Sequence, residues 1–157
     1  MRKLTTIAVA LMAFSGIAMA QTASVQVIHN SPDPGAASVD IYINEGMDPA
    51  IPDFAFRAAT PVLELSAGVE LRIGVAPGNS SGPDDILATF PVVLEDGGSY
   101  LVMATGVLDM SLPGNPEGED TAFTLKIFSP LTTSASAGWV ELLAYHGATD
   151  APTVDVQ

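Results

Sequence analysis

The sequence predicts an all-β fold, an antiparallel two-sheet sandwich that is immunoglobulin-like or similar. After the first 20 residues, apolar side chains recur at every second position, which is typical of strands with one packed and one wet face. Segments rich in Gly, Pro, Asn and Asp separate these runs, and no window shows the pattern of a capped amphipathic helix. Seven or so short strands with frequent turns favour a two-sheet sandwich.

The expected strands can be placed in order along the chain. The most regular is 69–75, where four apolar residues alternate with Glu70, Arg72 and Gly74. In the run 86–94, Pro91 cannot donate to a strand ladder, so an edge strand or a bend is expected there. The strands are expected at residues 25–30, 39–44, 69–75, 86–94, 100–104 and 123–127. The turns are expected at residues 31–35, 44–53, 77–85, 96–98 and 113–120.

The N-terminus has the three parts of a secretory signal peptide. A pair of basic residues precedes the apolar run Leu4–Ile17, and Ala18-Met19-Ala20 then provides a small-x-small cleavage site. A membrane anchor needs about 20 apolar residues, and this run is shorter. We therefore expect residues 1–20 to be removed and the protein to be exported to the extracellular space or cell surface, with the periplasm as a further option.

The charge of the chain restricts its partners. The 157 residues carry 5 basic and 18 acidic side chains, a net charge of −13. Two of the basic residues lie in the signal peptide, so the remainder carries 3 − 18 = −15. Such a surface repels phosphate backbones and anionic lipid, so no nucleic acid partner and no membrane insertion after cleavage are expected. A surface polymer or a protein remains as the partner class.

One sequence pattern occurs twice. His29-Asn-Ser-Pro-Asp33 is followed by Ser38-Val39-Asp40-Ile41, and His146-Gly-Ala-Thr-Asp150 is followed by Thr153-Val154-Asp155-Val156. We call residues 29–41 the first motif and residues 146–156 the second motif. Their histidines are the only two in the chain, and each precedes an Asp by four residues. The repeat predicts a first β-sandwich copy at 24–128, a linker at 129–138 and the truncated start of a second copy at 139–157.

The second copy is too short to fold by itself, because an isolated pair of strands is marginal in water. We expect it to fray or to dock loosely on the first copy, so that deleting residues 129–157 moves the melting temperature by only a few degrees. A piece of a longer tandem protein and a truncated gene both remain open as explanations.

These motifs also carry a family resemblance. The strand, the His-x-Ser/Ala-x-Asp turn and the following Val-Asp-Ile/Val strand resemble the bacterial domain-of-unknown-function family 4397. The resemblance covers most of the chain after residue 20 and is strongest at 25–44 and 143–156. Asp53-Phe54 and the segment 61–68 fit the middle of the family. The resemblance implies an exported or cell-surface β-sandwich module, often in tandem, and it carries over no catalytic residues.

The pairs His29 with Asp33 and His146 with Asp150 can be interpreted as metal ligands or as acid–base pairs. No Cys, no further His and no metal-type spacing complete such a site. We expect instead that Asp33 caps its own turn and that the imidazole binds a neighbouring carboxylate. The sequence therefore predicts no catalytic, cofactor-binding or metal-ligating residue, and no cofactor.

Three acidic loop clusters remain, at Asp84-Asp85, Glu95-Asp96 and 117–120. The interpretation is solvated loop charge, with a weak calcium site as the alternative. No nucleophile elbow or phosphate-binding glycine loop follows the signal peptide. The sequence favours an exported structural or adhesive module that is not an enzyme. The alternative is a carbohydrate or cell-surface polymer binding module, with or without the help of calcium.

Overall fold

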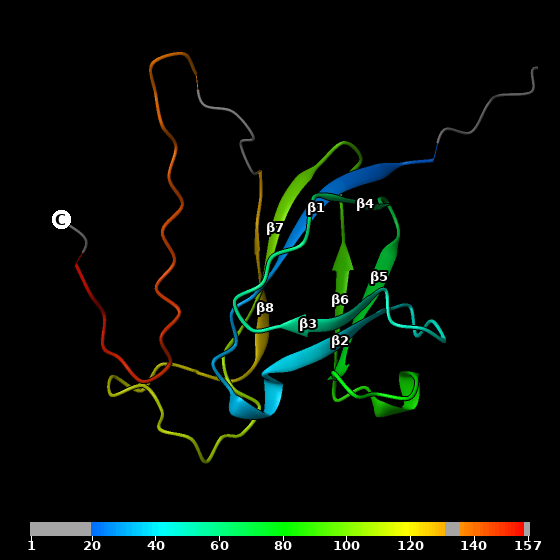
Figure 1. Cartoon of the computed structure of the whole chain (residues 1–157). Helices are drawn as coiled ribbons and strands as arrows, with labels where there is room; N and C mark the ends of the chain where they lie inside the picture. The colour runs from blue at the N-terminus through cyan, green and yellow to red at the C-terminus, as the bar shows by residue number, and fades with distance from the viewer. Residues whose placement is uncertain (1–19, 131–135, 156–157) are drawn as a thin grey trace, which may run out of the picture.

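The structure, a computed structural model, describes residues 20–130 and 136–155, and its regular secondary structure consists mainly of strands (Figure 1). The predicted signal peptide lies outside the described residues, apart from Ala20. The strands are β1 Thr22–His29, β2 Ser38–Ile43, β3 Ile51–Ala55, β4 Leu63–Ser66, β5 Glu70–Pro77, β6 Ala88–Val93, β7 Ser99–Thr105 and β8 Thr124–Phe128. Two short 3₁₀ turns are η1 Pro34–Ala36 and η2 Pro83–Asp85.

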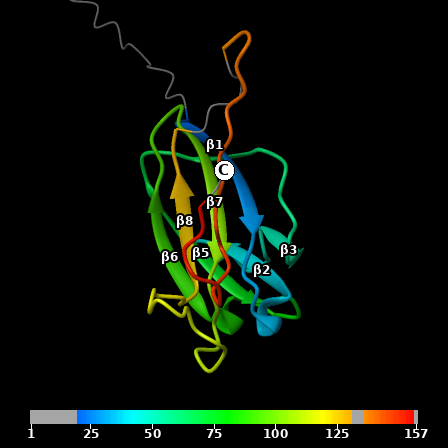
Figure 2. The same ribbon diagram turned by 90° about the vertical axis from the view of Figure 1, so that its left-hand side faces the viewer.

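The strands form two four-stranded sheets that pack face to face. Sheet A has the order β4-β1-β7-β8, and sheet B has the order β3-β2-β5-β6. Figures 1 and 2 show the two layers from views a quarter-turn apart. The predicted all-β sandwich is confirmed. Its strand pairs are antiparallel except for β1 and β7, which run parallel from Ser24 opposite Ser99 to His29 opposite Ala104.

The period-two pattern determines which side chains enter the core. In β5, Leu71 and Val75 are 4% and 1% exposed, whereas Glu70 and Arg72 point to solvent. Burying one such aliphatic side chain contributes about 1.5–3 kcal/mol. The inner faces meet in two apolar clusters, one around Val25, Leu71, Leu94 and Val102, and the other around Val39, Phe54 and Val75.

Two edge strands were not predicted from the sequence, because a bulge interrupts the alternation in β3 and because β4, although it alternates, is very short. Strand β3 begins in the segment 44–53 that was expected to be a turn. Its Asp53 has φ +51°, and the register of its pairing with β2 shifts between Val39 and Ile41, so a bulge interrupts the period of two. Strand β4 has only four residues. The expectation for Pro91 is confirmed, since β6 is an edge strand of sheet B.

The segment 136–155 passes along the outer side of sheet A. In Figure 1 it descends beside β8, and in Figure 2 it passes in front of β7 and β8. It forms no strand within its described residues. In the part of the chain that the structure describes, no helix is long and apolar enough to cross a membrane.

Candidate functional site

The first motif lies where β1 ends and the chain turns into β2. His29 is 0% exposed, and its Nε2 donates to the carbonyl oxygen of Ala36 at 2.7 Å. Its Nδ1 accepts from the backbone N–H of Ser31 at 3.4 Å, which assigns the proton to Nε2. The expectation of a carboxylate partner for this imidazole was wrong. The ring instead joins two backbone groups of its own turn, the N–H of Ser31 and the carbonyl of Ala36.

The surroundings of His29 keep it neutral. The rings of Phe54 and Phe56 lie 5.8 and 6.1 Å from the imidazole, centre to centre. Burial lowers the pKa of His29, and the hydrogen bond to Ala36 offsets this only in part. A neutral imidazole with both nitrogens bonded to backbone has no free nitrogen for a metal or a substrate.

Asp33 is the second polar group of the motif, and it is 4% exposed. One carboxylate oxygen accepts from the N–H of Gly35 at 2.7 Å, which confirms the predicted turn cap. The other oxygen accepts from Leu108 at 2.7 Å and Asp109 at 2.8 Å. Burial alone raises the pKa of the Asp33 carboxyl, but the three backbone bonds outweigh it, so the pKa lies below its usual value.

The bonds to residues 108 and 109 are the part of the motif that sequence reasoning missed. Asp33 thereby fastens its turn to the connection between β7 and β8, about 75 residues further along. The buried Ser31 adds a second link, because its hydroxyl donates to the carbonyl of Gly106 at 2.6 Å. Neither link has a sequence signal, since the partners are backbone groups brought close only by the fold.

Asp40, the Asp of the Val-Asp-Ile strand, is also buried, on the outer side of sheet B. It accepts from the N–H of Asp53 at 2.8 Å and from the hydroxyl of Ser80. The Tyr42 hydroxyl lies 2.8 Å from the same Ser80 oxygen. Asp40 therefore connects β2 to the bulge of β3 and to the loop after β5.

The second motif repeats the histidine contact of the first but not its burial. His146 Nε2 lies 3.1 Å from the carbonyl oxygen of Pro152, across the turn, and the side chain is exposed. Asp150 is exposed, and no hydrogen bond to its carboxylate is found in the described ranges 20–130 and 136–155. The His–carbonyl bond thus forms in both motifs, whereas only the first has an Asp bonded to a distant loop.

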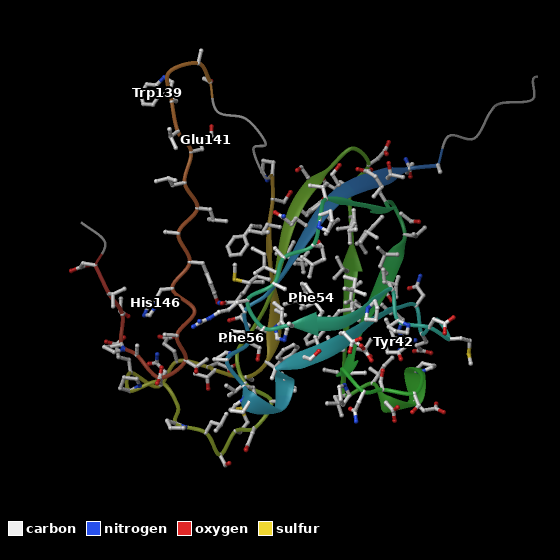
Figure 3. The ribbon with its side chains drawn as sticks, viewed as in Figure 1. Tyr42, Phe54, Phe56, Trp139, Glu141 and His146 are labelled. Atoms are coloured by element: carbon white, nitrogen blue, oxygen red, sulfur yellow. The ribbon has the colours of Figure 1, made fainter. Side chains whose placement is uncertain are left out.

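The segment that carries the second motif is held to the sandwich by side chains. Tyr145 packs edge-on against Phe128 with ring centres 5.9 Å apart, and its hydroxyl lies 3.4 Å from that of Thr105. Asn115 donates to the carbonyl of Ala151 at 2.9 Å. Figure 3 shows Trp139 near the start of the same segment, with its side chain pointing away from the sheets. Trp139 is 76% exposed.

We expect deletion of residues 129–157 to lower the melting temperature by only a few degrees and to leave unfolding cooperative. The segment contributes one half-buried Tyr and a few part-buried or exposed hydrogen bonds, which together amount to about 1 kcal/mol after the cost of ordering the segment. Thermal unfolding of the full and shortened chains, followed by circular dichroism, measures the difference. Loss of cooperative unfolding would mean that the segment is an integral part of the first sandwich.

A further contact ties the second motif to the acidic loop before β8. The hydroxyl and N–H of Thr153 both donate to one carboxylate oxygen of Glu117, at 2.6 and 3.2 Å. These two bonds lower the pKa of Glu117, and the bond from the Thr153 hydroxyl has the larger effect. We expect Thr153→Val to move this pKa back toward its ordinary value. Carboxyl-detected NMR titration measures the change, and Thr149→Val is the control. An unchanged Glu117 pKa in Thr153→Val would show that the contact does not persist in solution.

Between this acidic loop and the second motif lies a cavity of about 560 Å³, which we call the polar pocket. Its two walls are the residues before and within β8 and the turn after Tyr145. The pocket combines carboxylates, one ammonium group, hydroxyls, an imidazole and two aromatic rings. Its side chains include Glu119, Asp120, Lys126, Tyr145, His146 and Thr149.

The acidic clusters singled out in the sequence lie apart from one another. Asp85 accepts from the N–H of Ser81 at 2.6 Å beside η2, and Asp96 accepts from that of Thr22 at 3.2 Å. Glu119 and Asp120 line the polar pocket. Over residues 20–130 and 136–155, no group of three or more His, Asp or Glu side chains is arranged to hold a metal ion.

Comparison with known proteins identifies the family of the chain. Curated proteins and solved structures give no match. The family model described as domain of unknown function DUF4397 matches residues 23–157, which include every strand from β2 to β8, all but the first residue of β1, and both motifs. The chain therefore belongs to the DUF4397 family.

Proposed function

We propose that this protein is an exported structural or adhesive β-sandwich module that is not an enzyme. The observation that supports the proposal is that the polar side-chain atoms of the first motif are bonded within the fold. Both nitrogens of His29 and both carboxylate oxygens of Asp33 are bonded to backbone groups of the fold. A general base or nucleophile needs a group within reach of the substrate, and neither side chain presents one. The motif therefore serves to connect the turn after β1 to the rest of the sandwich.

Export is the part of this proposal that depends on residues 1–20. We expect the secreted or surface-held protein to begin at Gln21, within a residue or two, because the small-x-small site ends at Ala20. Mass spectrometry of material recovered from the producing cells checks this. A protein retained in the membrane with Met1 in place would contradict it.

The adhesive role is tested by attachment of the producing cells to a surface. Deleting the gene is expected to lower attachment several-fold, and the wild-type gene is expected to restore it. Variants that alter exposed chemistry without touching the fold, such as Glu119→Gln with His146→Gln, should restore it as well. Attachment that is lost in this double variant, while the protein is folded and exported, would argue for a specific site instead of a structural or adhesive module.

The polar pocket favours a second function, the binding of carbohydrate or another cell-surface polymer. Sugars are bound by hydroxyl and carboxylate groups with an aromatic ring beside them, and the pocket contains all three kinds. Calcium could assist if Glu119 and Asp120 on the pocket wall shared it with oxygens of the polymer, because no group of three or more acidic or His side chains in the described residues is arranged to hold the ion alone. Tandem copies would add avidity to a weak site.

Calorimetric titration with soluble oligosaccharides, in calcium and in chelator, distinguishes the two functions. A binding module should show saturable heat that Asp120→Asn abolishes, while Asp150→Asn, outside the pocket lining, leaves it unchanged. Absence of heat with cell-wall and capsular oligosaccharides in both buffers would leave the structural or adhesive module as the function.

A further inference from the structure

A second cavity lies between the two sheets. Its volume is about 250 Å³, and we call it the apolar cavity. Its lining is aliphatic apart from Phe54 and Glu64, and it comes from the inner faces of both sheets. The central lining residues are Val27, Ile43, Leu65, Ile73, Val102 and Leu125.

The burial of these residues shows that the sheets diverge on one side. Val25 and Leu71 are 1% and 4% exposed, as expected for side chains in a closed sandwich core. Ile43 and Ile73 also belong to the inner apolar face, yet they are only partly buried. Such exposure at inward positions means that the facing sheet does not cover them.

The mouth of the cavity is located by its exposed lining residues. Ala50, just before β3, is exposed, and Leu63 and Leu65, the inward-facing residues of β4, are only half-buried. The cavity therefore opens between β3 and β4, an edge strand of each sheet. The carboxylate of Glu64 lies on the outer face of sheet A, where it accepts from the hydroxyl of Ser24, its opposite residue in the β1–β4 pair, at 2.7 Å.

The chemistry of the lining determines what can occupy the space. Water needs two to four polar partners, and the aliphatic walls provide none beyond the rim. An empty apolar cavity destabilises a fold in proportion to its volume, so an apolar occupant stabilises it. A dry apolar cavity of about 150 Å³ binds benzene, with six carbons, so 250 Å³ in proportion accepts about ten carbons.

The charge of the protein selects the polar end of the occupant. Among the residues that the structure describes, no lysine or arginine lines the cavity, and the whole chain has a net charge of −13. A carboxylate or phosphate head would meet this negative field without a cationic partner, whereas an uncharged hydroxyl can remain hydrated at the opening.

We propose that the apolar cavity is a binding site for one uncharged aliphatic molecule of about ten carbons, such as a fatty alcohol, entering between β3 and β4. The alkyl chain lies between the sheets, and its hydroxyl stays hydrated at the opening between β3 and β4. This site is independent of the polar pocket and of the structural or adhesive function proposed above, so either proposal can fail without the other.

The test is a titration of the protein beginning at Gln21 with 1-decanol, followed by methyl NMR. The methyl signals of Ile43, Ile73 and Val102 should shift to saturation, and the melting temperature should rise. Decanoate at neutral pH should bind at least about five-fold more weakly, because its carboxylate enters the negative field of a protein whose net charge from Gln21 onward is 3 − 18 = −15. Unmoved cavity methyls, or equal affinity for decanol and decanoate, would overturn the proposal.

A filled variant separates binding in the cavity from adsorption elsewhere. Ala104→Leu adds three carbons to the lining and should weaken 1-decanol binding about ten-fold or more while preserving the fold. Ala55→Leu, at an exposed position outside the lining, is the matched control and should bind as wild type does. Equal binding in the two variants would place the ligand outside the cavity. If Ala104→Leu does not fold, the difference in affinity of the wild-type protein for decanol and decanoate still tests the proposal.

Discussion

Replacing His29 with alanine is expected to lower the free energy of unfolding by about 4 kcal/mol. The side chain is 0% exposed, so its removal leaves a cavity beside Phe54 and Phe56. The carbonyl of Ala36 and the N–H of Ser31 also lose their partner. Urea unfolding followed by circular dichroism measures the change.

The chain provides the control for this prediction. His146 has the same bond to a carbonyl across its turn, but it is exposed. His146→Ala should therefore change the free energy of unfolding by less than about 0.5 kcal/mol. Equal losses in the two variants would contradict the assignment of His29 as a buried structural residue.

The pH dependence of stability gives a second test of His29. Burial lowers its pKa in the folded protein below the unfolded value of about 6.5. The unfolded chain therefore takes up the proton first, so this contribution to stability is complete above pH 6.5 and is lost as the pH falls through the folded pKa. In a plot of the free energy of unfolding against pH, wild type should lose stability as the pH falls below about 6.5. His29→Gln should flatten this loss, whereas His146→Gln should retain it.

Replacing Asp33 with alanine is expected to lower the free energy of unfolding by about 3 kcal/mol. Its carboxylate accepts three backbone hydrogen bonds while it is 4% exposed, and a bond to a charged group contributes about 1.5–3 kcal/mol. Part of the lost free energy is regained, because the three N–H groups can bind water once the carboxylate is gone. Asp33→Asn, which keeps one oxygen acceptor, should lose less than Asp33→Ala.

Asp150 is the matched control, because it occupies the same place in the second motif and is exposed. Asp150→Ala should change the free energy of unfolding by less than about 0.5 kcal/mol.

The contribution of Asp33 to stability should depend on pH in the acid range. The folded pKa of Asp33 lies below the unfolded value, so its contribution is complete above about pH 4 and is lost as the pH falls through the folded pKa. The difference between wild type and Asp33→Asn should therefore shrink below about pH 4. A constant difference down to acid pH would contradict the role of the charge.

Several features of this protein could be predicted from local pattern alone. The alternation in 69–75 predicted strand β5, because a period of two needs only neighbouring residues to be visible. Pro91 marked β6 as an edge strand, because a residue without an N–H cannot occupy the middle of a ladder. The turn cap of Asp33 was also predictable, since donor and acceptor are two residues apart.

Other features depend on groups that only the fold brings together. The partner of His29 is a backbone carbonyl. Because every residue has a backbone carbonyl, no residue type at any spacing could predict which one binds the imidazole. The same holds for the N–H groups of Leu108 and Asp109 that bind Asp33 across 75 residues. The parallel pairing of β1 with β7 and the bulged strand β3 likewise arise from long-range packing.

The two motifs illustrate this division between sequence and tertiary structure. By sequence alone they are near-equivalent, and both form the short-range bond between the histidine and a carbonyl across the turn. Only tertiary structure separates them: β7 and the connection to β8 lie against the first motif and bury it, whereas the second lies exposed on the outer side of sheet A. The sequence determined the turn, because its atoms are neighbours in the chain. Burial and long-range bonding were decided by the strands that pack on it, because hydrogen bonds between distant segments form only once the sandwich has closed.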